Sequence, residues 1–102
     1  MRTPQDVERG LTAPERLGLN TRVEIRKAAT QLLEEMPEGS GRLVIDLSYT
    51  REIDSAGLGA LMLIQRKASE RRQVVVLKRP NDELRFLLVL TKLDDLFEVE
   101  AD

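Results

Sequence analysis

The feature that most constrains the fold of this chain is the alternation of two kinds of apolar pattern along it. Short, nearly continuous apolar runs at 43–47 and 73–77 alternate with longer segments, at 22–36, 57–71 and 81–93, whose apolar residues recur at helical spacing. Short apolar runs between turns are typical of buried strands, and helices that link such strands form the crossovers of a parallel sheet. The alternation therefore predicts an α/β fold with a mostly parallel sheet.

The remaining segments predict shorter elements. Scattered apolar residues among glycines and a proline favour one or two short strands around 6–13 and 15–18. Residues 96–99 alternate between apolar and polar, as an edge strand does. We expect Ile53 to end a short extension of the layer that contains the strand at 43–47.

The length of 102 residues predicts a single domain, 1–102, in which residues 1–12 hold a short or poorly ordered first strand. The longest apolar stretch, 58–64, is far too short to span a membrane. The polar N-terminus lacks the apolar core of a signal peptide. We therefore expect a cytoplasmic protein without direct membrane insertion.

The composition removes most kinds of catalysis. The chain contains no cysteine and no histidine, which excludes disulfides, thiolate chemistry and the commonest general base and metal ligand. Neither a nucleophile elbow nor a phosphate-binding loop occurs. Asp46 and Asp54 could in principle form an acid pair or bind a metal, but we expect no enzyme activity, no metal and no cofactor. The balance of 16 basic and 18 acidic residues, with few aromatics, argues against a nucleic-acid partner.

The most distinctive segment is Ile-Asp-Ser-Ala-Gly-Leu-Gly at 53–59, between a predicted strand and a predicted helix. Ser55 falls where the helix begins, near unpaired backbone N–H groups that tolerate a phosphate. The added charge would change the surrounding surface strongly. Gly57 and Gly59 lack side chains, so another protein could approach closely. Taken alone, the local pattern favours the plainer interpretation of Ser55 as an N-cap and Gly57 as a turn glycine.

This segment resembles the Asp-Ser-x-Gly-Leu-Gly signature of STAS domains, which occur in bacterial anti-sigma-factor antagonists. Other parts of the chain are similar to the family in the same order: the first helix with its preceding strand (14–36), the strand that ends in Asp-Leu (43–47), the next strand (74–77), and the last helix with a Leu-x-x-Leu-Phe run (81–97). The resemblance extends over roughly 14–100.

The resemblance implies a fold and a function. The family fold is a four- to five-stranded mixed, mostly parallel sheet with helices packed largely on one side. In the antagonists, a serine kinase of the histidine-kinase-like ATPase type is also the anti-sigma factor. The unphosphorylated antagonist binds it and frees the sigma factor, so transcription is regulated. Phosphorylation of the signature serine ends the binding, and a phosphatase resets the switch.

The residues that match the signature are the candidate site. Ser55 is the candidate phosphorylation site, and a phosphate there would adjoin the negative charge of Asp54. Ala56 stands where many relatives carry a hydroxyl, so Ser55 is the only hydroxyl of the motif. The candidate partner-binding residues are Asp54, Ser55, Ala56, Gly57, Leu58, Gly59 and Met62.

Two alternatives stay open at the level of the sequence. The chain could instead be a constitutive STAS subunit of a stress-signalling or lipid-transport complex that is not phosphorylated. Separately, Leu63, Ile64, Phe86 and Val89 make the last two predicted helices too apolar for one buried face each. Either these helices pack against each other and the sheet, or part of this surface docks a partner.

Overall fold

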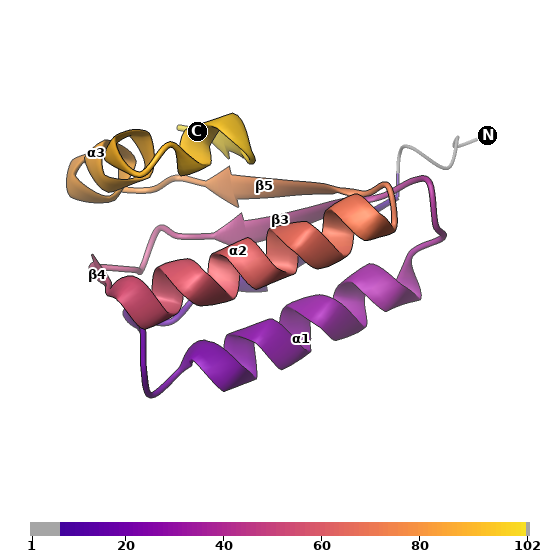
Figure 1. Ribbon diagram of the computed structural model, residues 1–102, viewed down its shortest axis with the longest axis horizontal. Helices are drawn as coiled ribbons and strands as arrows, with labels where there is room; N and C mark the ends of the chain where they lie inside the picture. Colours follow the sequence, from indigo (N-terminus) through magenta and orange to yellow (C-terminus); the bar gives the residue numbers. More distant parts are fainter. Residues whose placement is uncertain (1–6, 102) are drawn as a thin grey trace.

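The computed structural model describes residues 7–101, so the expectations for residues 1–6 lie outside the described part of the chain. Four strands form one sheet in the order β1-β3-β5-β6, and Figure 1 labels its two middle strands, β3 and β5. They are β1 (Glu8–Thr12), β3 (Arg42–Asp46), β5 (Val74–Lys78) and β6 (Glu98–Glu100). The α/β class and the mostly parallel sheet are confirmed, and within residues 7–101 all pairings are parallel.

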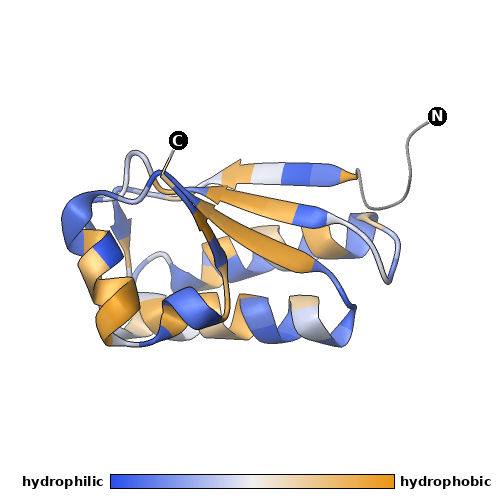
Figure 2. Ribbon diagram, turned by 90° about the horizontal axis from the view of Figure 1, so that it is seen from above, coloured by the Kyte–Doolittle hydropathy of each residue, from blue (hydrophilic) through white to orange (hydrophobic). Residues whose placement is uncertain are grey.

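Helices cover one face of this sheet. Figure 2 shows α1 (Arg22–Glu35) and α2 (Ser55–Glu70) lying side by side beneath it. The shorter α3 (Asp82–Leu90) and a 3₁₀ turn, η2 (Leu93–Asp95), lie at the carboxyl ends of the strands (Figure 1). The predicted packing of helices largely on one side is therefore confirmed.

The core lies between the sheet and the two long helices. Alternate residues of β3 and β5 face the helices in register, with Leu43 beside Val75 and Ile45 beside Leu77, and all four are buried. They meet the apolar stripes of the helices: Ile25, Ala29 and Leu33 from α1, and Leu61, Ile64 and Ala68 from α2. Each fully buried Leu or Ile contributes about 1.5–3 kcal/mol. This layer holds α2 against the sheet.

The opposite face of the sheet has no helix over it and carries charges. Arg42 lies across this face and pairs with Glu98 at 2.8 Å, Glu100 at 3.3 Å and Glu8 at 3.5 Å. Partly exposed ion pairs of this kind contribute little stability. The face is therefore largely charged, although Val74 beside Arg42 is 39% exposed.

The position expected for Ile53 is wrong. Ile53 belongs to β4 (Glu52–Ile53), which pairs in parallel with β2 (Arg16–Leu17) as a separate two-stranded sheet. A turn closed by the Thr50 N–H on the Leu47 carbonyl at 3.0 Å leads the chain away from the main sheet after β3. The small sheet consequently lies against the start of α2, where the backbone N–H of Asp54 donates to the Leu17 carbonyl at 3.2 Å.

The third helix ends earlier than the sequence predicts. α3 stops at Leu90 rather than continuing to Leu93, because Lys92 adopts a left-handed conformation with φ 62°. The Thr91 hydroxyl donates to the Leu87 carbonyl at 2.8 Å and so occupies a carbonyl of the last turn. Leu93 then turns into the core. The predicted edge strand is confirmed, although it begins at Glu98 rather than at residue 96.

Candidate functional site

The candidate site is built around the first turn of α2. Asp54 is the N-cap: its Oδ1 accepts from the Gly57 N–H at 2.9 Å and its Oδ2 from the Leu19 N–H at 3.3 Å. The interpretation of Ser55 as the cap is therefore wrong. Asp and Ser are nearly equal as N-caps, and the loop that brings the Leu19 N–H to the carboxylate decides for Asp54.

The carboxyl group of Asp54 stays ionised in this setting. The hydrogen bond from the Gly57 backbone lowers the pKa of Asp54 most, and backbone hydrogen bonds from Leu19 and Ala56 lower it further. The positive charge of Arg22 acts in the same direction. A fixed negative charge therefore adjoins Ser55 at neutral pH.

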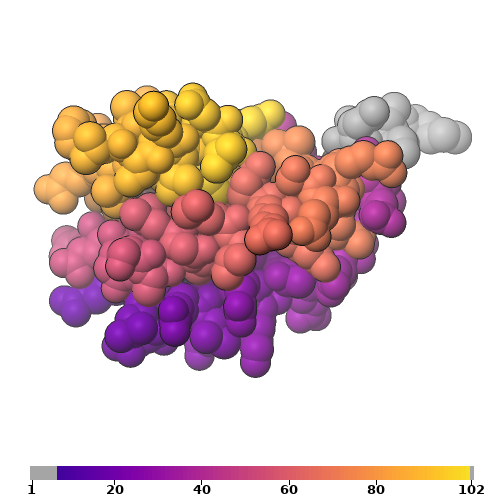
Figure 3. All heavy atoms as spheres, in the orientation of Figure 1, coloured from indigo at the N-terminus to yellow at the C-terminus, as the bar shows by residue number. Residues whose placement is uncertain are grey.

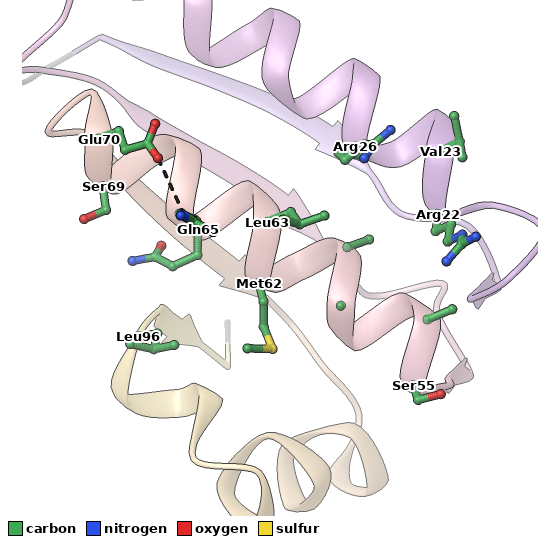
Figure 4. Close-up of a pocket in the computed structure, with 14 residues that line it drawn as sticks. Arg22, Val23, Arg26, Ser55, Met62, Leu63, Gln65, Ser69, Glu70 and Leu96 are labelled. Carbon is green, nitrogen blue, oxygen red and sulfur yellow. Dashed lines mark ion pairs between the residues drawn. The ribbon is translucent and has the colours of Figure 1, made fainter.

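Ser55 is the first residue of α2 and is exposed. Its hydroxyl makes no hydrogen bond to any residue of the described chain, and Figure 4 shows it pointing outward. Since Asp54 performs the capping, the Ser55 hydroxyl has no structural partner in residues 7–101.

The two glycines of the signature have different surroundings. Gly57 is buried, and a Cβ there would collide with the Leu17 carbonyl. Gly59 has nothing within 4 Å of the place of its missing Cβ. Gly57 thus lets β2 pack on α2, whereas Gly59 leaves helix backbone open to an approaching molecule. Gly18 has a role that the sequence analysis missed, because a Cβ there would collide with the Asp54 carboxylate.

A groove runs along the outer side of α2, starting at Ser55. Its volume is about 940 Å³. Figure 3 shows this face, with α2 lying between α1 and the C-terminal segment, and Figure 4 shows the side chains around the groove. The apolar side chains that line it are Val23, Ala56, Ala60, Met62, Leu63 and Leu96, and the charged ones are Arg22, Arg26, Arg66 and Glu70.

The structure brings most of the predicted partner-binding residues to one surface. Ser55, Ala56, Gly59 and Met62 line the groove, and Asp54 is exposed beside it. Leu58 is half-buried against the core, and Gly57 is buried. The contribution of α1 and of Leu96, which follows η2, could not be predicted from the sequence, because helical periodicity does not say which neighbour an exposed residue lies beside.

The structure also shows which of the extra apolar residues on the last two helices are buried and which are exposed. Ile64 is buried in the core, but Leu63, Phe86 and Val89 are 46%, 68% and 59% exposed. Phe86, Val89 and Leu90 form an outward stripe on α3. The structure therefore favours exposed apolar surface over mutual packing of α2 and α3.

The two carboxylates singled out in the sequence, Asp46 and Asp54, both have pKa values below the usual range. Asp46 accepts a hydrogen bond from the Ser48 N–H at 2.9 Å and pairs with Arg79 at 3.0 Å. The Ser48 hydrogen bond is the largest cause of its lowered pKa. A general acid needs a raised pKa, which neither Asp46 nor Asp54 has.

Within residues 7–101 no cluster of acidic side chains could hold a metal ion. No helix in the same range has the length and apolarity to cross a membrane.

Comparison with known proteins identifies the family. The family described as "Mlab, STAS domain" matches residues 5–98, which include the Asp54-Ser55 signature and all of the groove. The chain belongs to the STAS domain family. The resemblance in the sequence is therefore confirmed.

Solved structures show the same fold. A candidate anti-sigma factor antagonist from Thermotoga maritima is 26% identical, with a TM-score of 0.75, and the alignment covers 93% of this chain and 80% of that one. The antagonist SpoIIAA in its unphosphorylated form is 15% identical, with a TM-score of 0.67 and coverage of 100% and 84%. A sulfate transporter family protein from Wolinella succinogenes is 16% identical, with a TM-score of 0.67 and coverage of 93% and 75%. The last two likenesses show the fold alone.

Proposed function

We propose that this STAS domain is an anti-sigma-factor-antagonist-like switch that binds a protein partner and is regulated by phosphorylation of Ser55. The observation that carries the proposal is that Asp54 and Ser55 have different structural roles. Asp54 caps α2, while Ser55 is exposed and its hydroxyl has no partner in the described chain. The fold shared with anti-sigma factor antagonists supports it.

The proposed partner is a serine kinase of the histidine-kinase-like ATPase type that also serves as the anti-sigma factor. The unphosphorylated domain binds this kinase in the bacterial cytoplasm and frees the sigma factor. A phosphatase returns the phosphorylated form to the active state. The domain itself acts by binding and not by catalysis.

The geometry of the first turn explains how a phosphate would act. The phosphate adds about −1.5 to −2 charges and lies near the positive end of α2, which tolerates an anion. The helix therefore stays folded. The change falls on the surface, where the phosphate joins the ionised Asp54 and repels acidic groups of a bound partner.

A second candidate is a constitutive STAS subunit of a stress-signalling or lipid-transport complex. The outward stripe of Phe86, Val89 and Leu90 on α3 favours it, because these side chains are more than half exposed and do not line the groove at Ser55. A permanent interface would cover such a stripe. This function would need no phosphate.

Mass spectrometry of the protein isolated from its own cells separates the two candidates. We expect a gain of one phosphate on the peptide that contains Ser55, in at least some growth or stress conditions. The gain is absent in Ser55→Ala and retained in Ser69→Ala, a matched control because Ser69 is also exposed on α2. A protein unmodified in every condition would favour the constitutive subunit.

A further inference from the structure

We propose that the groove along α2 receives an amphipathic helix of the protein partner, whose acidic side chains pair with Arg22 and Arg26. The inference rests on the proposed function, because it assigns the chemistry of the partner at that same site.

The shape of the groove suits a helix. The groove extends from Ser55 to Glu70, the whole length of α2, whose 16 residues span about 24 Å. It is a long open trough with α1 on one side and Leu96 on the other (Figure 4). The open backbone at Gly59 lets a helix come close to the floor. An amphipathic helix laid in an apolar groove is a recurrent mode of peptide recognition.

The lining offers apolar contacts from three segments. Val23 from α1, Met62 and Leu63 from α2, and Leu96 after η2 are each about half exposed. Their inner halves are fixed by the fold, and their outer halves remain in water. Because these four side chains line one groove, the apolar face of a single helix would cover all of them at once.

The charges at the groove are asymmetric. Arg22 and Arg26 lie one helical turn apart on α1, are exposed, and make no ion pair with any residue from 7 to 101. By contrast, Arg66 pairs with Glu70 at 3.7 Å near the other end. Asp54 offsets part of the charge of Arg22, but Arg26 remains, so the surplus positive charge lies toward Ser55 and electrostatic complementarity favours acidic groups of the partner there.

Phosphorylation would act on this same end of the groove. Ser55 and Arg22 both line the groove near the start of α2 (Figure 4). A phosphate on Ser55 adds to the negative charge of Asp54 near Arg22 and repels the acidic side chains of the incoming helix. The phosphate and the partner thus compete for one arginine, which couples modification to binding.

A displayed library of random helical peptides of about 16 residues, selected against the full chain, tests the proposal. We expect enrichment of peptides with acidic residues and with apolar residues at i, i+3, i+4 and i+7 spacing. One enriched peptide is then titrated against variants. We expect Arg26→Glu to weaken binding about tenfold or more and Leu63→Asp to abolish it. We expect Lys27→Glu, the same charge change at an exposed neighbour outside the groove, to alter binding less than about twofold.

Several results would overturn the proposal. Enrichment of neutral or basic peptides, no enrichment at all, or equal weakening by Arg26→Glu and Lys27→Glu would each contradict it. A dimer in solution that Leu63→Asp dissociates would show that a second copy fills the groove. The test is separable from that of the switch: a phosphate on Ser55 without selection of acidic peptides defeats only the groove, and selection of acidic peptides with Ser55 never modified defeats only the switch.

Discussion

At the scale of single residues, Asp54 and Ser55 are neighbours with different duties. Asp54 closes the first turn of α2 through the Gly57 N–H and holds the loop before α1 through the Leu19 N–H. Ser55 does neither. A structural serine would be costly to modify, but the structural bonds here belong to the aspartate. A phosphate can therefore change the surface without unfolding the helix.

The different roles of Asp54 and Ser55 predict that alanine substitutions at the two positions change the stability of the fold unequally. We expect Asp54→Ala to lower the free energy of unfolding, because it leaves the Gly57 N–H without its cap. We expect Ser55→Ala to leave it within about 0.5 kcal/mol of wild type. Denaturant unfolding of both variants measures the difference. Equal destabilisation by the two would contradict the assignment of the cap.

The pH dependence of stability follows from the same carboxylate. The hydrogen bond from Gly57 lowers the pKa of Asp54 in the folded chain, so the unfolded chain binds the proton more readily. The stabilisation is fully present above the pKa of the unfolded chain and is lost as pH falls through the folded value. We expect the stability difference between wild type and Asp54→Asn to shrink below about pH 4. Unfolding measured from pH 7 to pH 2 tests this, and a constant difference would contradict it.

At the scale of elements, the two signature glycines predict opposite effects. Gly57→Ala places a Cβ against the Leu17 carbonyl and should cost about 1–3 kcal/mol, because β2 must shift away from α2. Gly59→Ala meets open space inside a helix and should stabilise the fold by about 0.5–1 kcal/mol. Thermal unfolding of the pair checks both signs. A stabilising Gly57→Ala would show that β2 does not pack on α2 as described.

Much of the architecture could be predicted because period and length separate its elements. The β-branched run at 74–77 indicates a strand, and the helical spacing of Ile25, Ala29 and Leu33 indicates a helix. The pairing of β4 with β2 could not be predicted, because two-residue strands carry no period. The capping residue could not be predicted either, because Asp54 and Ser55 both suit an N-cap.

The candidate site was predictable only in part for a similar reason. Ser55, Gly59 and Met62 follow from the signature and from helical spacing, and the structure places all three at the groove. Arg22 and Arg26 were not foreseen, because their place beside Ser55 depends on how α1 packs against α2. That packing is decided by residues on the opposite sides of both helices.

At the scale of the whole molecule, the helices cover only one face of the sheet, and the two sides of the molecule carry different surfaces. The open sheet face carries charges around Arg42, whereas the helical side carries the groove and the stripe on α3. The start of α2 lies at the carboxyl ends of the parallel strands, where α/β folds commonly place their binding sites. The proposed modification of Ser55 would therefore act on the surface that holds the groove.

The central claim, that phosphorylation of Ser55 and partner binding exclude each other, is tested most directly by fractionating native cell extract by size. The phosphate occupancy of Ser55 is then measured in each fraction by mass spectrometry. The account predicts phosphate on Ser55 in the fraction of the free domain and little or none in the fraction bound to a partner. Equal occupancy in both fractions, or no phosphate in either, would contradict it.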